Sequence, residues 1–201
     1  MKKIIRFGIM AYLLIGTLPS MAQFYYDFVD TCSPSQVMYY SITSDTIPYT
    51  VKVHGGYDTT GHLNIPDTVR RGNRLFKVTS IQQMAFYQDT TLISVTLPAN
   101  ISNIERLAFG SCPNLNTIYW NAKNVTNYTS GNYHPFYNCM AIRNVIFGDS
   151  VRIPDHAFEN TYINSVIIAN TTTYIGNYAF ANSSSIMAIT LPEGIEHIGH
   201  H

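Results

Sequence analysis

One pattern constrains the fold of this chain more than any other: the dipeptide Ala-Phe recurs at nearly constant spacing. It occurs at Ala85-Phe86, Ala108-Phe109, Ala157-Phe158 and Ala179-Phe180, and Pro135-Phe136 fills the gap between the second and third of these pairs. The spacings between successive Phe residues are 23, 27, 22 and 22. Self-similarity at a period of about 20–50 residues is the sequence mark of repeat architectures. We therefore expect the chain to stack five similar units.

Each unit continues with a pattern of apolar-x-x-apolar-x-apolar residues. The copies are LISVTL (92–97), LNTIYW (115–120), IRNVIF (142–147), INSVII (163–168) and IMAITL (186–191). The alternating end of this pattern predicts a strand with one buried face. We expect the Ala-Phe pair on a short helical turn, with the five Phe side chains in the core. Since one unit cannot bury its own apolar face, the predicted fold is a repeat solenoid, mainly β with short helical turns.

The repeat resembles a known family. The stretch VTSIQQMAFYQDTTLISVTLPANISNIERLAFGSCPNL is similar to the BspA-type leucine-rich repeat, whose units read V-x-x-I-x-x-x-A-F-x-x-C-x-x-L-x-x-I-x-L-P. The segment YYSITSDTIPYTVKVHGGYDTTGHLNIPDTVRRGNRLFKVTSI resembles the β-rich N-terminal cap of such proteins in Bacteroides-type bacteria. The resemblance covers about residues 38 to 201. It implies a right-handed leucine-rich-repeat solenoid and a secreted or cell-surface protein, in a family where a few members are adhesins for host matrix proteins.

The N-terminal segment predicts export. Lys2, Lys3 and Arg6 precede an apolar stretch, and Ser20-Met21-Ala22 supplies the small residues that a signal peptidase reads. We predict a cleaved signal peptide over residues 1–22, a β-rich cap over 23–77, and repeats over 78–201. The apolar stretch is shorter than the ~20 residues of a membrane span, and no second one follows. The expected location is outside the cell or on its surface, with no membrane span after cleavage.

The end of the chain, EGIEHIGHH, aligns with the repeat. Ile198 and Gly199 match Ile175 and Gly176, so the next two residues after His201 should be Ala-Phe. We interpret the end as an interrupted sixth repeat, with an uncapped edge that could self-associate. The alternative is a metal site formed by His197, His200 and His201, which an extended segment does not favour. We expect no metal and no cofactor.

Two cysteines share one column of the repeat. Cys112 and Cys139 each lie three residues after a repeat Phe, in adjacent units. Adjacent strands are about 4.8 Å apart, which is within the Cα range of a disulfide. The family pattern has Cys in this column, and a small buried thiol packs well there. We favour buried free thiols, with a disulfide as the alternative.

The composition and motifs exclude several functions. Lys+Arg and Asp+Glu number 12 each, which argues against the basic stripe that nucleic acid requires. The sequence has no G-x-S-x-G, no HExxH, no CxxC and no phosphate-binding glycine loop. The acidic residues do not recur at one repeat column. We therefore predict that the protein is not an enzyme.

Candidate binding residues lie at exposed columns and in the longest copy. Outward strand positions would align Tyr119, Ile146 and Ile167 as an apolar stripe, although β-branched residues also suit strands for their own sake. The 27-residue copy has about four extra residues in the segment 120–136, where an insertion maps to a surface loop. Its candidate contact residues are Trp120, Tyr128, Tyr133 and His134.

Three functions remain open from the sequence. The first is an exported, non-enzymatic binding or adhesion protein that recognises a host or bacterial surface protein or glycan. The second is a truncated structural fragment of a larger surface protein, with no ligand of its own and a tendency to self-associate. The third is a secreted enzyme whose site is dispersed over distant units.

Overall fold

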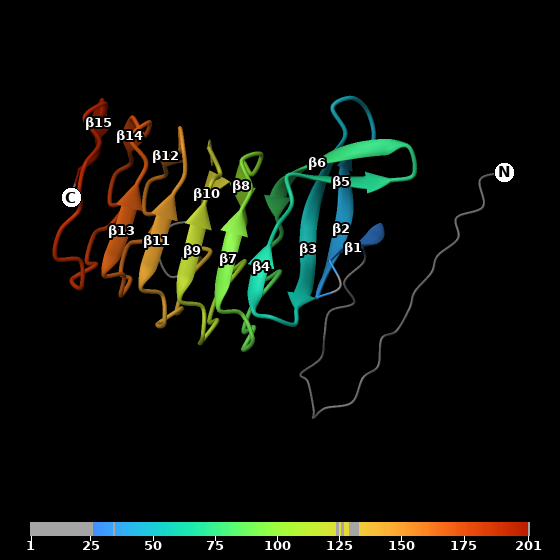
Figure 1. The fold of residues 1–201 in the computed structure, drawn as a ribbon, viewed down its shortest axis with the longest axis horizontal. Helices are drawn as coiled ribbons and strands as arrows, with labels where there is room; N and C mark the ends of the chain where they lie inside the picture. The colour runs from blue at the N-terminus through green and yellow to red at the C-terminus, as the bar shows by residue number, and fades with distance from the viewer. Residues whose placement is uncertain (1–25, 34, 124, 126, 129–132, 201) are drawn as a thin grey trace.

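The structure is a computed structural model that describes residues 26–200 apart from 34, 124, 126 and 129–132. The predicted signal peptide and His201 therefore lie outside the described residues. Strands stack side by side along the long axis, from a β-rich N-terminal unit to the C-terminal end (Figure 1). Among the residues that the structure describes, none form a helix that could span a bilayer.

The N-terminal unit is a sheet of long strands. Its strands are β1 (Phe28–Ser33), β2 (Gln36–Ser44), β3 (Thr50–Asp58), β5 (Thr68–Arg71) and β6 (Arg74–Ile81). β1, β2 and β3 pair in antiparallel fashion, and β5 and β6 form a hairpin, while β3 and β6 run parallel. Alternation sets the buried face: along β2 the side chains of Met38 and Tyr40 are buried, and along β3 those of Val51 and Val53.

A five-stranded parallel sheet forms one side of the solenoid. Its strands are β4 (His62–Asn64), β7 (Ser94–Leu97), β9 (Thr117–Trp120), β11 (Asn144–Phe147) and β13 (Ser165–Ile168). The four strands β7 to β13 are the ends of four of the predicted motifs, and they pair without a register shift. The first strand, β4, comes from the segment predicted as the cap, so the cap starts the sheet that the repeats continue.

Short strands form a second side of the solenoid in two separate sheets. Their strands are β8 (Asn103–Ile104), β10 (Asn127–Tyr128), β12 (Arg152–Ile153), β14 (Tyr174–Ile175) and β15 (His197–Ile198). β6, β8 and β10 pair in parallel and continue the N-terminal sheet, whereas β12, β14 and β15 pair among themselves. The division falls between the copies that contain Phe136 and Phe158. We call this junction the seam.

The Ala-Phe segments form consecutive tight turns, and the described residues contain no helix there, so the expectation of helical turns was wrong. In four copies, residues in the left-handed region (φ 54° to 60°) lie two positions before and two after the Phe. They are Met84 and Gln88, Leu107 and Ser111, His156 and Asn160, and Tyr178 and Asn182. A left-handed residue interrupts the hydrogen-bonding direction of a helix and turns successive N–H groups sideways. The repeat therefore turns its chain without a helix.

These turns bond to one another from copy to copy. Backbone N–H groups of Met84, Phe86 and Gln88 donate to the carbonyls of Arg106, Ala108 and Gly110. The next copy repeats the pattern, with Leu107, Phe109 and Ser111 donating to Tyr133, Pro135 and Tyr137. The turn side thus has its own parallel ladder of hydrogen bonds, which satisfies backbone groups that lie in no strand.

The repeat Phe side chains stack inside the solenoid. Ring centroids of Phe86 and Phe109, and of Phe109 and Phe136, are 5.1 Å apart with nearly parallel planes. Across the seam, Phe136 and Phe158 are 5.8 Å apart and tilted by 23°. Phe158 and Phe180 continue the stack at 6.2 Å. The stack is one continuous core that loosens from the seam onward.

The last strand motif does not form a strand. Residues 186–191 carry the apolar pattern of the other copies, yet they do not pair with β13, and the prediction of a fifth strand there was wrong. β15 still pairs with β14, so the chain closes the rung on one side and leaves it open on the other. Met187, the second residue of this motif, is 99% exposed. The outer edge of β13 is therefore unpaired among the described residues.

Candidate binding surface

The outward face of the five-stranded sheet carries two columns of aligned side chains. The outer column consists of Asn64, Thr96, Tyr119, Ile146 and Ile167, and the polar column consists of His62, Ser94, Thr117, Asn144 and Ser165. Residues between the columns, such as Val95 and Ile118, are fully buried. Strand alternation therefore separates a core face from a face that a partner can reach.

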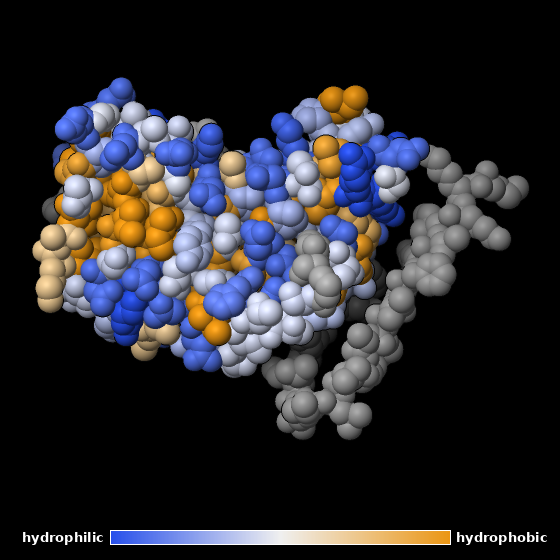
Figure 2. Space-filling model, in the orientation of Figure 1, coloured by the Kyte–Doolittle hydropathy of each residue, from blue (hydrophilic) through white to orange (hydrophobic). Residues whose placement is uncertain are grey.

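The outer column changes from polar to apolar along the sheet. Tyr119 is 43% exposed and Ile167 is 56% exposed, and Ile146 lies between them with partial exposure. Figure 2 shows hydrophobic side chains gathered over β11 and β13, toward the C-terminal end of the solenoid. Exposed apolar patches on soluble proteins mark sites of contact. The structure thus aligns the predicted stripe, and its role in binding stays a prediction.

The polar column is held by side-chain hydrogen bonds. The His62 Nδ1 atom lies 2.9 Å from the Ser94 hydroxyl. The Asn144 amide donates to the Asn116 side-chain oxygen at 3.0 Å, and the Thr117 hydroxyl donates to the same oxygen. These bonds fix the rotamers beside the apolar stripe, so the face presents a rigid pattern of apolar and polar groups.

The segment 120–136 differs from the expected contact loop, and Trp120 is the main correction. Trp120 is 0% exposed, and its indole N–H donates to the Ala122 carbonyl at 3.0 Å. Its ring lies 5.7 Å from Phe158 and 5.9 Å from Phe147. Trp120 ends its strand two residues after the buried Ile118, so alternation turns it into the core. It fills the core beside the seam and does not contact a partner.

The other residues predicted in that segment are distributed between surface and interior. Tyr133 is exposed, and the Arg106 guanidinium lies 4.4 Å above its ring. The backbone of Tyr128 belongs to β10, and its side chain lies outside the described residues. His134 is only 5% exposed, which corrects its expected place on a surface loop.

Pro135 explains the position of His134. All four other copies have a left-handed residue followed by Ala at this point, and its N–H bonds to the next copy. A residue before proline is driven toward extended conformations, and His134 is not left-handed. Its Nδ1 atom accepts the Phe136 N–H at 3.3 Å. In the neighbouring copy the equivalent N–H, that of Phe109, bonds to the next copy instead. One proline therefore removes a rung bond and draws an imidazole inward.

The seam has fewer backbone bonds than the other junctions. Among the described residues, this turn donates no backbone N–H of the regular pattern to the turn of the next copy; the three groups concerned are those of His134, Phe136 and Asn138. The next junction is regular again, because His156, Phe158 and Asn160 donate to Asn177, Ala179 and Ala181. The five-stranded sheet crosses the seam through β11 and β13, and so does a bond from Arg152 N–H to the Lys123 carbonyl.

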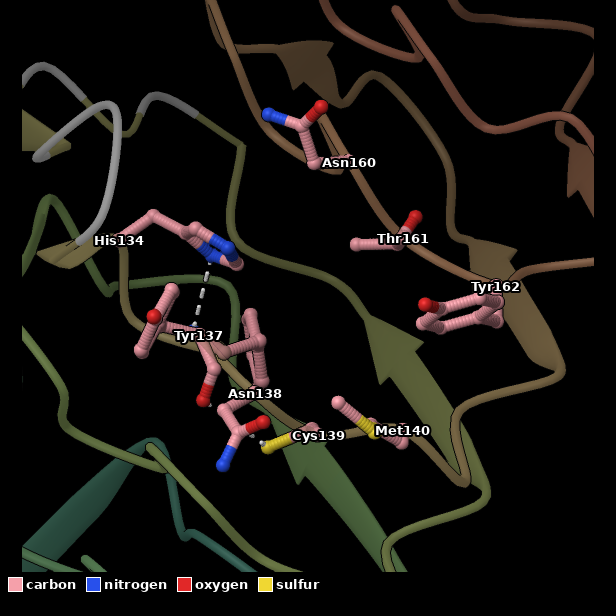
Figure 3. Close-up of a pocket in the computed structure, with 9 residues that line it drawn as sticks. His134, Tyr137, Asn138, Cys139, Met140, Asn160, Thr161 and Tyr162 are labelled. Atoms are coloured by element: carbon pink, nitrogen blue, oxygen red, sulfur yellow. Dashed lines mark hydrogen bonds between the residues drawn. The ribbon is translucent and has the colours of Figure 1, made fainter.

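A small pocket opens at the seam. It has a volume of about 170 Å³ and lies between residues 134–140 and 160–162 (Figure 3). Its mouth is formed by the exposed side chains of Tyr137, Met140 and Tyr162. Burial lowers the pKa of His134 to about 4, against a smaller opposing effect of Glu159, so the imidazole is neutral at pH 7. The volume is below the ~300–1,000 Å³ of drug-sized sites, so the pocket fits at most one small group.

The two column cysteines are buried free thiols. The Cys112 thiol donates to the Phe86 carbonyl at 3.0 Å, and the Cys139 thiol donates to the Phe109 carbonyl at 2.9 Å. A hydrogen bond with Cys139 and burial raise the pKa of the Cys112 thiol. A protonated, buried thiol is a poor nucleophile. Beyond the seam the same column holds Thr161 and Ser183, whose hydroxyls also donate to the Phe158 carbonyl.

The C-terminal histidines belong to the repeat. The His197 ring stacks on the Tyr174 ring, with the ring centroids 4.5 Å apart. The Arg152 guanidinium also lies over the Tyr174 ring, 3.9 Å from its centroid. The His200 N–H donates to the Asn177 side-chain oxygen at 3.0 Å. Within the described residues, no group of three or more His, Cys, Asp or Glu side chains is placed to hold a metal ion.

Sequence reasoning missed several residues of these surfaces. His62 and Asn64 begin the two columns but lie in the cap segment, outside the repeat alignment. Asn138, Asn160 and Tyr162 line the pocket at columns where other copies have ordinary surface residues. The sequence feature that could have indicated the pocket is Pro135, which replaces Ala in a single copy, together with the extra residues before it.

Comparison with solved structures shows the fold. A leucine-rich repeat protein from Bacteroides ovatus is 22% identical with a TM-score of 0.54, and the match covers 87% of this chain and 42% of that chain. A leucine rich cell surface protein from Faecalibacterium prausnitzii is 18% identical with a TM-score of 0.45, over 84% and 50% of the two chains. The chain thus spans about half or less of the length of these proteins. No curated protein matches the chain.

The repeat itself matches a sequence family. The profile of the BspA type leucine rich repeat region matches residues 73–152 and 151–201, in six copies. These matches cover every Ala-Phe turn and every repeat strand described above. The chain therefore belongs to the BspA-type leucine-rich repeat family.

Proposed function

We propose that this protein is an exported, non-enzymatic binding protein that engages a surface protein of a host or bacterial cell through the outward face of its five-stranded sheet. The family is consistent with a surface protein of the binding or adhesion type. The signal-like N-terminal segment supports export. The partner class rests on the shape and chemistry of the sheet face.

The observation that carries the proposal is the register of Tyr119, Ile146 and Ile167. Their strands pair without a shift, so the three side chains lie in one row about 4.8 Å apart. A row of aromatic and aliphatic groups beside hydrogen-bonding Thr117 and Asn144 has the composition of an interface core with a polar rim. A flat face of this kind suits a folded protein surface better than a small molecule, which needs a concave site.

The test uses a variant with Tyr119→Ser and Ile167→Ser. Purified wild type is passed over a panel of immobilised extracellular matrix and bacterial surface proteins, and affinities are measured for each member that binds. We expect the variant to lose at least tenfold in affinity, about 1.4 kcal/mol, for every partner that uses the sheet face. The matched control, Ile47→Ser with Ile93→Ser, also removes two exposed apolar side chains and should bind as wild type does.

Two results would contradict the proposal. An equal loss in the two variants would show that the sheet face has no special role. Hydrolysis of a panel member by the purified protein, abolished by substitution of one acidic residue, would favour the secreted enzyme.

The open end of the solenoid favours a second candidate, a structural fragment that self-associates. The outer edge of β13 is unpaired among the described residues, and its Ile167 is exposed, as are Met187 and Leu191 in the motif that follows along the chain. Unpaired edges of this kind pair with other chains. Under this alternative the chain binds no ligand, and its association depends on the open edge.

A further inference from the structure

The hairpin of β5 and β6 concentrates the positive charge of the N-terminal unit. Four cationic residues lie within eight positions: Arg70, Arg71, Arg74 and Lys77. All four are exposed, in a chain whose acidic and basic residues are balanced at 12 each. Figure 2 shows strongly hydrophilic side chains where Figure 1 places this hairpin, at the end opposite the apolar patch.

The hairpin turn places two arginines directly opposite each other. Arg71 pairs with Arg74 across the two strands, separated by the tight turn Gly72-Asn73, where Gly72 adopts a left-handed φ of 57°. Like charges directly opposite in a strand pair are destabilising. Within the described residues, His156 and Glu159 form the one ion pair with an N–O distance within 4.0 Å, so no described carboxylate lies that close to a cation of the hairpin.

Aromatic rings hold both guanidinium groups in place. The Arg71 guanidinium lies 5.4 Å above the Phe28 ring, and the Arg74 guanidinium lies 5.1 Å above the Tyr49 ring. Both rings pack against the buried Phe76, at 6.0 Å and 5.4 Å. The two cations are therefore supported on one aromatic cluster and need little further ordering to bind.

We propose that Arg71 and Arg74 form a site for the sulfate esters of an anionic polysaccharide. Each guanidinium presents a planar pair of N–H donors, and one such pair satisfies the two oxygens of a carboxylate. Two guanidinium groups together better match a sulfate ester, which has three free oxygens. A guanidinium is weakly hydrated, and an aromatic ring on one of its faces reduces its hydration further. A singly charged sulfate ester is also weakly hydrated. Strand alternation places Arg70 and Lys77 on the opposite face of the hairpin, so the proposed site consists of Arg71 and Arg74 alone.

The test measures the binding of dextran sulfate to the full chain by titration calorimetry at several salt concentrations. We expect binding at low salt that weakens linearly in log salt, since counterions are released. The double variant Arg71→Gln with Arg74→Gln should bind at least tenfold more weakly, and its salt exponent should fall by about 2. The control Arg106→Gln with Lys123→Gln removes the same charge elsewhere and should change binding less than threefold.

A further variant separates positioning from charge. Tyr49→Leu keeps both arginines but removes the ring under Arg74, so affinity should fall several-fold while the salt exponent stays as in wild type. Urea unfolding of each variant shows that the chain still folds.

Several outcomes would overturn the site. These are no binding of dextran sulfate by wild type, an equal loss in the two double variants, or equal affinity for polygalacturonate, which carries carboxylates only. Tighter binding of polyphosphate at matched charge would overturn the assignment to sulfate. If the hairpin double variant aggregates but still binds dextran sulfate, the charges only protect the edge strand β5.

Discussion

A single proline at position 135 changes the solenoid more than any insertion around it. In the copies with Ala at this place, the N–H of the repeat Phe or of the residue two positions before it bonds to a backbone carbonyl of the next copy. With Pro135, the imidazole of His134 supplies the acceptor for the Phe136 N–H and becomes buried. A group that titrates near neutral pH in water thereby becomes part of the core.

His134 gives a prediction about acid stability. Its folded pKa of about 4 lies below the ordinary value of 6.5, so the unfolded chain takes up the proton first as the pH falls. The stabilisation is complete above pH 6.5 and is lost as the pH falls through 4, a change of about 3 kcal/mol. We expect His134→Leu, which matches Leu107 in the same column, to flatten the dependence of urea unfolding on pH between 6.5 and 4.

The control for this prediction is His62→Gln, at an exposed position on the sheet face. It should keep the wild-type dependence on pH. If the free energy of unfolding of His134→Leu depends on pH as strongly as that of wild type, another group, and not His134, causes the dependence.

Trp120 gives a second prediction, because the structure moves it from the surface to the core. Trp120→Ala should destabilise the protein by about 3–5 kcal/mol, the range for aromatic core truncations, as measured by urea unfolding. Tyr119→Ala, one residue earlier and exposed, should cost less than about 1 kcal/mol. Equal costs would place Trp120 at the surface after all. Since Trp120 is the one tryptophan in the chain, a blue-shifted emission of the native protein reports its burial directly.

Among the structural elements of the repeat, the turn is the most distinctive. Each regular turn places two residues in the left-handed region, and none of these residues is glycine. A residue with a side chain pays about 1–2 kcal/mol for that conformation. The turns keep it because it directs backbone donors toward the next copy.

Gln88 allows a prediction about this conformation. Its side chain is exposed, its φ is 60°, and its N–H bonds to the Gly110 carbonyl. Gln88→Gly should raise the free energy of unfolding by about 0.5–1 kcal/mol, whereas Gln88→Val should lower it by at least 1 kcal/mol, because β-branched residues fit this region poorly. Urea midpoints of the two variants check this. Equal stability would mean that the left-handed turn is not needed there.

Periodicity predicted the elements well where each copy repeats the same local choice. The strand register, the Phe stack and the outward columns all follow from a repeat of 22 or 23 residues with one copy of 27. It failed where neighbours decide the outcome. Residues 186–191 have the strand pattern, but an apolar pattern forms a strand only when backbone partners are available. It also failed at the turns, because Ala and Phe do not reveal the sign of φ.

The candidate site was partly predictable for the same reason. Alternation placed Tyr119, Ile146 and Ile167 on one face, since side chains of paired strands share that geometry. The same alternation, applied one residue further, would have placed Trp120 in the core. The pocket and the arginine pair could not be derived, because they depend on segments far apart in the sequence, such as Phe28 and Arg71.

At the scale of the whole molecule, the two ends of the solenoid differ. The N-terminal end is a sheet of long strands, with Gln36 side-chain atoms bonded to both backbone groups of Asn64 at the edge of β4. The other end leaves β13 unpaired in the described part of the chain. This difference underlies the self-associating alternative, in which contact would form at the unpaired edge of β13.

This asymmetry predicts how the protein behaves with concentration. Light scattering on wild type should show association that grows with concentration, and Ile167→Lys with Met187→Lys should reduce it, because charges at a strand edge oppose pairing. Ile47→Lys, at an 84% exposed position in the N-terminal unit, should leave it unchanged. A monodisperse wild type at all concentrations would rule out the self-associating fragment.

The seam also has a mechanical consequence. The five-stranded sheet runs through it unbroken, whereas the short-strand sheets stop on either side and the turns lack their cross-bonds. A load that bends the solenoid should therefore be resisted mainly by this sheet, with one described backbone bond, from the Arg152 N–H to the Lys123 carbonyl, on the side of the short strands. We expect the parts of the solenoid before and after the seam to bend relative to each other about β11 and β13, and to separate first on the side of His134.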